Sequence, residues 1–289
     1  MSNKLIDLSG KIRDPNAIDA FRGVHKCAQA LGIPYLIVGA SARDLVMHHA
    51  FGVTIQRQTT DIDFAVQVAN WDDFESLKAQ LGSVGNFTIS NVSHRLYSSL
   101  GTPIDIVPFG GVADDQSIIK MPPNEFPMNV LGFKEALDSA YNIQLSDDLV
   151  VKVASPEGFV LLKFIAWTDR AADKRGRDAA DIGYMLNTYE EISEVKDSFF
   201  DSEELINKFD GDIRMYAAHR LGQRVESISS SESAQILKGI FECVNPKLDI
   251  EIFKIEMNRG YRSQHSNKLL EQFIEGFNQK KTGSLTVTN

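Results

Sequence analysis

The spacing of hydrophobic residues in the first third of the chain predicts helices and strands in alternation. Apolar residues recur at helical spacing over residues 17–31, and a second helical stretch covers 42–50. Between these helices, residues 35–38 form a short apolar run that is typical of a buried strand. Polar and apolar residues alternate over 61–66, which predicts another strand, and 71–81 has the pattern of an amphipathic helix.

The second part of the chain has a different pattern. Two hairpins are predicted first, at residues 87–99 with 103–109 and at residues 141–145 with 149–153. From Ser155 onward the pattern is mainly helical, because serine followed by proline is a typical helix start. We therefore expect two domains, residues 1–154 and a mainly helical domain at 155–289. Residues 280–289 are expected to be disordered.

Composition indicates a folded protein in the cytoplasm. The 289 residues are 43% hydrophobic, which is enough for a sizeable core. No apolar run approaches the roughly 20 residues of a membrane-spanning helix, and no signal peptide is evident, so no membrane partner is expected. The two cysteines have no neighbours at zinc-ligand spacing. The net charge of −9 argues against a general nucleic-acid coat protein but leaves room for a local basic groove.

Two aspartates on one predicted strand are the first candidate for chemistry. Asp61 and Asp63 lie two positions apart, so their side chains point to the same face of the strand. A cation relieves the repulsion between two such carboxylates. Mg²⁺ is suited to this because it takes oxygen ligands and shares them with substrate phosphates. The alternative for a bare Asp-x-Asp pair is two solvated acids on an edge strand.

A glycine turn lies upstream of this pair, between a predicted buried strand and a helix. Gly39 allows the backbone to turn and a phosphate to approach closely, Ser41 offers a hydroxyl, and the amides of the next helix face an anion. The alternative is a simple strand-to-helix connector. One helix and a return strand separate this turn from Asp61, so the turn and the acids can meet at one end of a sheet.

A third acid, Asp105, is flanked by apolar residues on a predicted central strand. A charge is costly in such a place unless it is paired or bound to a metal. Arg95, which the hairpin brings close, is the alternative partner. Together Asp61, Asp63 and Asp105 supply the carboxylates of a two-metal site, in which one ion activates the attacking hydroxyl and the other holds a triphosphate.

These motifs resemble the DNA polymerase β-like nucleotidyltransferase superfamily, whose signature is a glycine turn followed by Asp-x-Asp and a third acid. Residues 38–44 (VGASARD), residues 57–64 (RQTTDIDF), Lys163 and Asp178 are similar to the AbiEii/MenT branch, toxins of type IV toxin–antitoxin systems. The similarity covers about residues 35–185. It implies an α+β fold with a mixed sheet flanked by helices and a mainly helical C-terminal domain.

The resemblance also implies an activity and roles for individual residues. A nucleoside monophosphate would pass from a nucleoside triphosphate to a hydroxyl with release of pyrophosphate, using two Mg²⁺ ions, with Mn²⁺ as an alternative. The metal ligands would be Asp61, Asp63 and Asp105. The triphosphate would be bound by Gly39, Ala40, Ser41, Arg43 and Lys163. Many relatives have Gly-Ser adjacent, whereas Ala40 stands between Gly39 and Ser41 in this chain.

Three of these residues have alternative interpretations. Lys163 sits on an apolar helix, from which a lysine can extend to solvent without binding a ligand. Asp178 either positions Lys163 or assists the acceptor, and the alternative is a solvated charged loop. Arg43 either reaches a phosphate, which we favour, or pairs with Asp44 or Asp63.

The acceptor is open between two classes. The resemblance favours RNA such as a tRNA 3′ end, for which the basic stretch 174–177 would supply a local phosphate contact. The alternative is a small molecule of the aminoglycoside type, which suits an acidic protein. A non-catalytic relative that binds a nucleotide or a partner protein is a third possibility. If the chain is a toxin, an antitoxin protein is an expected partner.

Overall fold

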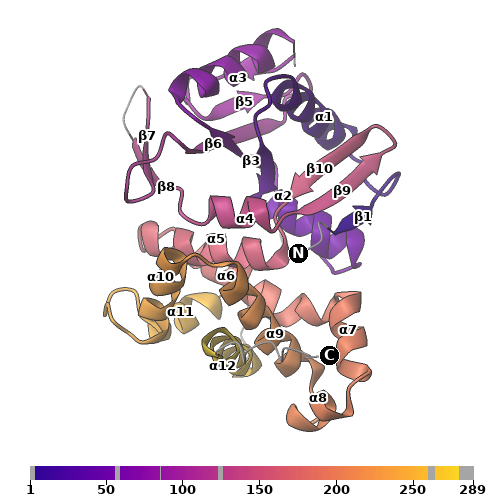
Figure 1. The fold of residues 1–289 in the computed structure, drawn as a ribbon, viewed down its shortest axis with the longest axis vertical. Helices are drawn as coiled ribbons and strands as arrows, with labels where there is room; N and C mark the ends of the chain where they lie inside the picture. The colour runs from indigo at the N-terminus through magenta and orange to yellow at the C-terminus, as the bar shows by residue number, and fades with distance from the viewer. Residues whose placement is uncertain (1–3, 56–58, 85, 123–125, 260–263, 280–289) are drawn as a thin grey trace, which may run out of the picture.

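The chain folds into a mixed β-sheet with helices on both faces, followed by a helical half (Figure 1). A computed structural model describes residues 4–55, 59–84, 86–122, 126–259 and 264–279. The eight strands of the main sheet are β1 (Leu5–Asp7), β2 (Tyr35–Val38), β3 (Ile62–Val68), β4 (Thr88–Ile89), β5 (Arg95–Tyr97), β6 (Pro103–Gly110), β9 (Tyr141–Ser146) and β10 (Leu149–Val153). A separate hairpin consists of β7 (Ile118–Met121) and β8 (Phe126–Asn129).

The strand order places β3 in the middle of the sheet. The order is β1-β9-β10-β2-β3-β6-β5-β4, and β3 is antiparallel to β2 and parallel to β6. Most residues of β3 are buried, because helices cover both faces of the sheet at this point. In this register Asp63 lies opposite Val38 on one side and Asp105 on the other, so both acids lie at the same end of the sheet.

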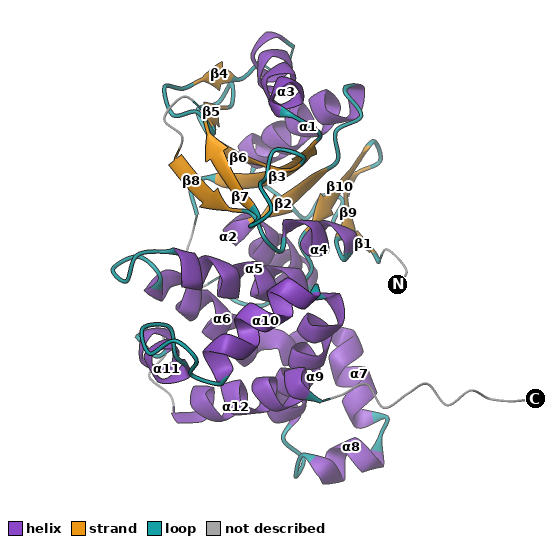
Figure 2. Cartoon of the chain, turned by 60° about the vertical axis from the view of Figure 1, so that its left-hand side comes forward, coloured by secondary structure: helices purple, strands orange, loops and turns teal. Residues whose placement is uncertain are grey.

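The helices of the first half flank the sheet. Helices α1 (Pro15–Ala30) and α3 (Trp71–Ser83) lie on one face, and α4 (Phe133–Asp138) lies on the other (Figures 1 and 2). The side chain of Asp14 caps α1 and that of Asn70 caps α3, each accepting a backbone N–H of the first turn. The short helix α2 (Gly39–Arg43) follows β2 directly and continues as the π-helix η1 (Asp44–Ala50).

The helical half is organised around α5, which lies between the sheet and the remaining helices (Figure 2). Its elements are α5 (Pro156–Asp169), α6 (Gly176–Thr188), the 3-10 helix η2 (Tyr189–Glu191), α7 (Ser193–Phe200), α8 (Glu203–Lys208), α9 (Ile213–Ile228), α10 (Ser231–Phe241), α11 (Ile250–Met257) and α12 (Gln264–Asn278). As predicted, Ser155 caps α5 by accepting the Gly158 N–H. Phe164 of α5 stacks on Phe253 and Phe273, which ties α11 and α12 to the centre.

The predicted α+β fold with a mixed sheet and a helical C-terminal part is confirmed, and both predicted hairpin pairings are present. Two predictions differ in detail. The helix predicted at 42–50 begins already at Gly39, and the strand predicted at 87–99 is interrupted. The interruption follows from Ser90, whose hydroxyl accepts the Val92 N–H and closes a local turn. β1, α4 and the β7–β8 pair were not predicted.

The predicted domain boundary and the predicted disorder of the C-terminal residues both stay predictions. β10 ends at Val153 and α5 begins at Pro156, but the division into domains at 154/155 stays a prediction. Residues 280–289, which we expect to be disordered, lie outside the described residues. No helix among the residues described here is both long enough and apolar enough to cross a membrane.

Candidate active site

Three carboxylates meet where β3 and β6 lie side by side. Asp63 and Asp105 are direct neighbours in the parallel register, and Asp61 immediately precedes β3. One carboxylate oxygen from each of the three residues lies within 4.8 Å of the others. The predicted convergence of these acids is therefore present in the fold, while their binding of a metal stays a prediction.

The electrostatic state of Asp63 reflects this crowding. Burial raises the pKa of the Asp63 carboxyl to about 6, and the neighbouring charges of Asp61 and Asp105 contribute in the same direction. The positive charges of Lys163 and Arg170, both in the helical half, oppose this rise in the pKa of Asp63. A divalent cation would favour the charged form of Asp63 in the same way.

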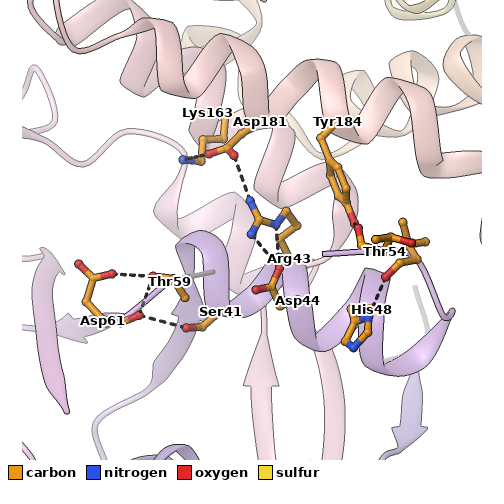
Figure 3. Close-up of polar contacts among 11 residues, drawn as sticks. Ser41, Arg43, Asp44, His48, Thr54, Thr59, Asp61, Lys163, Asp181 and Tyr184 are labelled. Atoms are coloured by element: carbon orange, nitrogen blue, oxygen red, sulfur yellow. Dashed lines mark hydrogen bonds and ion pairs between the residues drawn. The ribbon is translucent and has the colours of Figure 1, made fainter. Parts of the chain in front are cut away.

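Asp61 and Asp105 are each held by a polar neighbour. Thr59 Oγ1 donates to Asp61 Oδ1 at 2.6 Å, and the Ser41 hydroxyl donates to the Asp61 carbonyl at 3.4 Å (Figure 3). Arg95 donates to both carboxylate oxygens of Asp105, at 2.7 Å in each case. The alternative partner of Asp105, Arg95, is therefore present, while a metal-binding role for Asp105 beside the other two acids stays a prediction.

The glycine turn is built against the acids. Gly39 has φ +64°, a conformation that favours glycine, and a Cβ at this position would lie 2.1 Å from Asp63 Oδ2. Glycine is therefore required here to leave room for the Asp63 carboxylate. Ala40 and Ser41 follow in the first turn of α2, as the predicted strand–turn–helix arrangement requires. Residues 57 and 58 of the second motif lie outside the described residues.

The sequence matches a known protein family. The family model described as "Nucleotidyl transferase AbiEii toxin, Type IV TA system" matches residues 39–246, which is well over half of the chain. The chain belongs to the AbiEii nucleotidyltransferase family. The match begins at the glycine turn and includes all three acids together with Lys163 and Asp178. No curated protein matches this AbiEii family member.

Several solved structures align with the AbiEii chain. An antigenic nucleotidyltransferase-like protein from Paracoccidioides brasiliensis has 18% identity and a TM-score of 0.38, over 67% of this chain and 92% of that chain. The antibiotic-resistance factor ANT(2'')-Ia has 13% identity and a TM-score of 0.35, over 67% and 97%. A Thermotoga maritima CCA-adding enzyme complexed with tRNA_CCA has 14% identity and a TM-score of 0.28, over 96% and 86%. These likenesses are distant, and none assigns a substrate to the AbiEii chain.

The helical half of the AbiEii chain contributes a second group of charged residues, which lies on α5 and α6. The ammonium of Lys163 on α5 lies 3.0 Å from Asp178 Oδ1 and 2.6 Å from Asp181 Oδ2, both on α6. Asp178 is fully buried and also accepts from Arg170 at 2.9 Å. The alternative of a solvated charged loop is therefore wrong for Asp178. Its contact with Lys163 agrees with the interpretation that Asp178 positions this lysine.

Two residues of this group were missed by sequence reasoning as parts of the site. Asp181 links Lys163 to Arg43 (Figure 3). Arg170 pairs with Asp178 at 2.9 Å. A signal was available for Asp181, because it lies three positions after Asp178 and therefore on the same face of a predicted helix.

Two cations expected at phosphates have buried acidic partners. Arg43 is buried and pairs with Asp44 at 2.8 Å and Asp181 at 3.1 Å, while its contact with a phosphate stays a prediction. The pairing with Asp44 was the alternative. Arg175 of the basic stretch is also buried, bonded to Glu256 at 3.0 Å over the Trp167 ring. A guanidinium that is already paired in the core cannot serve as an exposed phosphate contact.

Proposed function

We propose that this AbiEii family member transfers a nucleoside monophosphate from a nucleoside triphosphate to a hydroxyl acceptor, with pyrophosphate leaving. The observation that carries the proposal is the convergence of Asp61, Asp63 and Asp105 within 4.8 Å, with Lys163 and Arg170 acting on the same cluster. Acids on one side and cations on the other suit a metal-bound polyphosphate.

The acids fit a divalent metal. Three carboxylates whose mutual repulsion and burial raise the pKa of Asp63 are stabilised by a hard cation with oxygen ligands. Asp61, Asp63 and Asp105 would hold two Mg²⁺ ions, with Mn²⁺ as an alternative. When bound, such ions supply Lewis-acid stabilisation of the phosphate charge and activate the acceptor hydroxyl.

The remaining residues act by position and charge. Lys163 is fixed by Asp178 and Asp181, so its ammonium has a defined place from which to stabilise negative charge on the triphosphate. The turn at Gly39, Ala40 and Ser41 presents backbone amides at the start of a helix, where an anion is favoured. Positioning and electrostatics together are the main sources of catalysis in phosphoryl transfer.

RNA, such as a tRNA 3′ end, is the acceptor we favour. Lys174 and Arg177 of the basic stretch are exposed, so two cations of this stretch remain for a phosphate backbone after Arg175 is excluded. Because the family is described as a toxin of a type IV system, we propose that an antitoxin protein is its partner.

A small-molecule acceptor is the second candidate, and one observation favours it. A cavity of about 460 Å³ opens beside Ser41 and Asp61, and its described lining includes Asp14, Asp44 and His49 but no lysine or arginine. Carboxylates and hydroxyls without a fixed cation suit an amine- and hydroxyl-bearing molecule of the aminoglycoside type better than a phosphate backbone.

A transfer assay tests this function. The purified chain is incubated with Mg²⁺ and each labelled triphosphate, once with total RNA and once with an aminoglycoside panel. Label is expected in RNA, and Asp63→Asn is expected to reduce transfer by at least about a hundredfold. Asp138→Asn, which changes an exposed acid paired with Lys134, is the matched control. Unchanged transfer in Asp63→Asn would contradict the proposed nucleotidyltransferase function. Label in aminoglycosides alone would overturn the RNA preference, and triphosphate binding without transfer would indicate a non-catalytic relative.

A further inference from the structure

Arg95 is a cation built into the acidic cluster. It lies on β5 directly opposite Asp105 in the antiparallel register. Its Nε and Nη2 atoms donate to the two carboxylate oxygens of Asp105, and Nη2 lies 3.8 Å from Asp61 Oδ2. The side chain is 32% exposed, so it has room to move away from the acids.

This contact competes with a metal ion for the same atoms. A two-point guanidinium–carboxylate pair engages both oxygens of Asp105 in the plane of the carboxylate. A divalent ion arriving at the cluster would meet a positive charge only a few ångströms away, and Coulomb repulsion would weaken its binding. Arginine does not lose its proton in proteins, so the repulsion is relieved only when the side chain moves.

Arg95 differs in this respect from the two cations of the helical half. Lys163 and Arg170 are held in the helical half by Asp178, and Lys163 also by Asp181. Among the residues that the structure describes, the ion-pair partners of Arg95 are Asp105 and Asp61, both proposed metal ligands. Arg95 therefore pairs with the acids of the cluster directly, whereas Lys163 and Arg170 pair with acids of the helical half.

We propose that Arg95 is an internal counter-ion that makes divalent-metal binding depend on the nucleotide. Without nucleotide, Arg95 occupies Asp105 and the acids bind a metal weakly. A triphosphate brings the negative charge that offsets the guanidinium, so metal and nucleotide strengthen each other's binding, and this coupling is necessarily reciprocal. The inference rests on the proposed function, since it concerns the same three acids.

Mn²⁺ binding to the full chain tests the proposal without any turnover. Binding is measured by electron paramagnetic resonance, first with Mn²⁺ alone and then with α,β-methylene triphosphate analogues of the four common bases. We expect Arg95→Gln to bind Mn²⁺ alone about tenfold more tightly than wild type, and to lose most of the strengthening by the analogue. Arg22→Gln is the matched control, because it removes a half-exposed arginine whose ion-pair partner is Asp148 and none of the three acids.

A second variant separates charge from fold. Arg95→Lys keeps the charge but loses the two-point contact, so its Mn²⁺ affinity should lie between those of wild type and Arg95→Gln. Circular dichroism of each variant tests whether it is folded. Unchanged or weaker Mn²⁺ binding in Arg95→Gln, or weaker binding than wild type in Arg95→Lys, would overturn the proposal. Absence of Mn²⁺ binding in every variant, with and without analogue, would overturn the proposed metal site as well.

Discussion

At the residue scale, Gly39 connects a backbone turn to the position of an acidic side chain. Its φ of +64° suits glycine, and the Asp63 carboxylate occupies the space that a Cβ would need. The same glycine therefore does two things. It lets the chain pass from β2 into α2, and it lets Asp63 lie against that turn instead of being pushed away from Asp61 and Asp105.

Gly39→Ala is accordingly expected to damage both stability and transfer activity. The backbone conformation alone costs an alanine roughly 1–2 kcal/mol, and the added methyl group must displace the Asp63 carboxylate. Gly32→Ala is the control, because Gly32 has φ +66° but no atom within 4 Å of the added Cβ. Thermal melts should show similar backbone losses in the two proteins, while transfer should fall at least about tenfold only in Gly39→Ala. Wild-type transfer in Gly39→Ala would contradict this reading of the turn.

The three acids and Arg95 could be brought together from the sequence, whereas the pairing of Asp181 with Arg43 and Lys163 could not. Asp61 and Asp63 share a face because side chains in a strand alternate, and Asp105 could be placed because a lone acid in an apolar strand needs a partner. The partner of Asp181 depends instead on how α6 packs against α5 and α2, which no local pattern encodes. The same limit explains why Arg43 was expected at a phosphate.

At the scale of elements, helices α9 and α12 approach each other at two glycines. A Cβ on Gly276 of α12 would lie 1.9 Å from the backbone oxygen of His219, and a Cβ on Gly222 of α9 would lie 2.0 Å from that of Phe273. The hydrophobic spacing of the two helices predicts that each buries a face. It does not show which helix lies opposite, so this contact could not be read from the sequence.

Gly276→Ala should separate the two helices and destabilise the helical half. Overpacking of a close contact costs typically 1–3 kcal/mol, and here the obstacle is backbone rather than a movable side chain. Gly239→Ala in α10 is the matched control, since nothing lies within 4 Å of its added Cβ. That change should be neutral or stabilising by up to about 1 kcal/mol, because alanine is the better helix former. Urea unfolding compares the two, and equal midpoints would show that the helices are not packed this closely.

At the scale of the whole molecule, the candidate site depends on how the sheet and the helical half are joined. The three acids come from the sheet, while Lys163, Asp178 and Asp181 come from α5 and α6. The family match, residues 39–246, also spans both halves. The predicted domain boundary near Ser155 marks where the chain changes from strands to helices. The candidate site includes residues from both sides of this boundary, because charges from both halves affect the pKa of Asp63.

Arg43 joins the two halves beside the site. Its guanidinium is 1% exposed, pairs with Asp44 on η1 and Asp181 on α6, and lies 5.4 Å from the Tyr184 ring. Arg43→Ala would leave Asp44 and Asp181 without this partner in a buried place, so we expect a loss of roughly 3 kcal/mol in the free energy of unfolding. Arg214→Ala removes a half-exposed arginine that lies 3.7 Å from Asp212, and it should cost less than about 1 kcal/mol.

Urea denaturation followed by tryptophan fluorescence measures both variants, because Trp71 lies on α3 and Trp167 on α5, one in each half. If Arg43 joins the halves, its removal should lower the midpoint at both tryptophans or separate a single transition into two. Arg214→Ala should leave the curve close to wild type. A loss in Arg43→Ala no larger than in the control would mean that the buried ion pairs do not hold the halves together, and that the position of Lys163 relative to the acids is set by apolar packing around α5 instead.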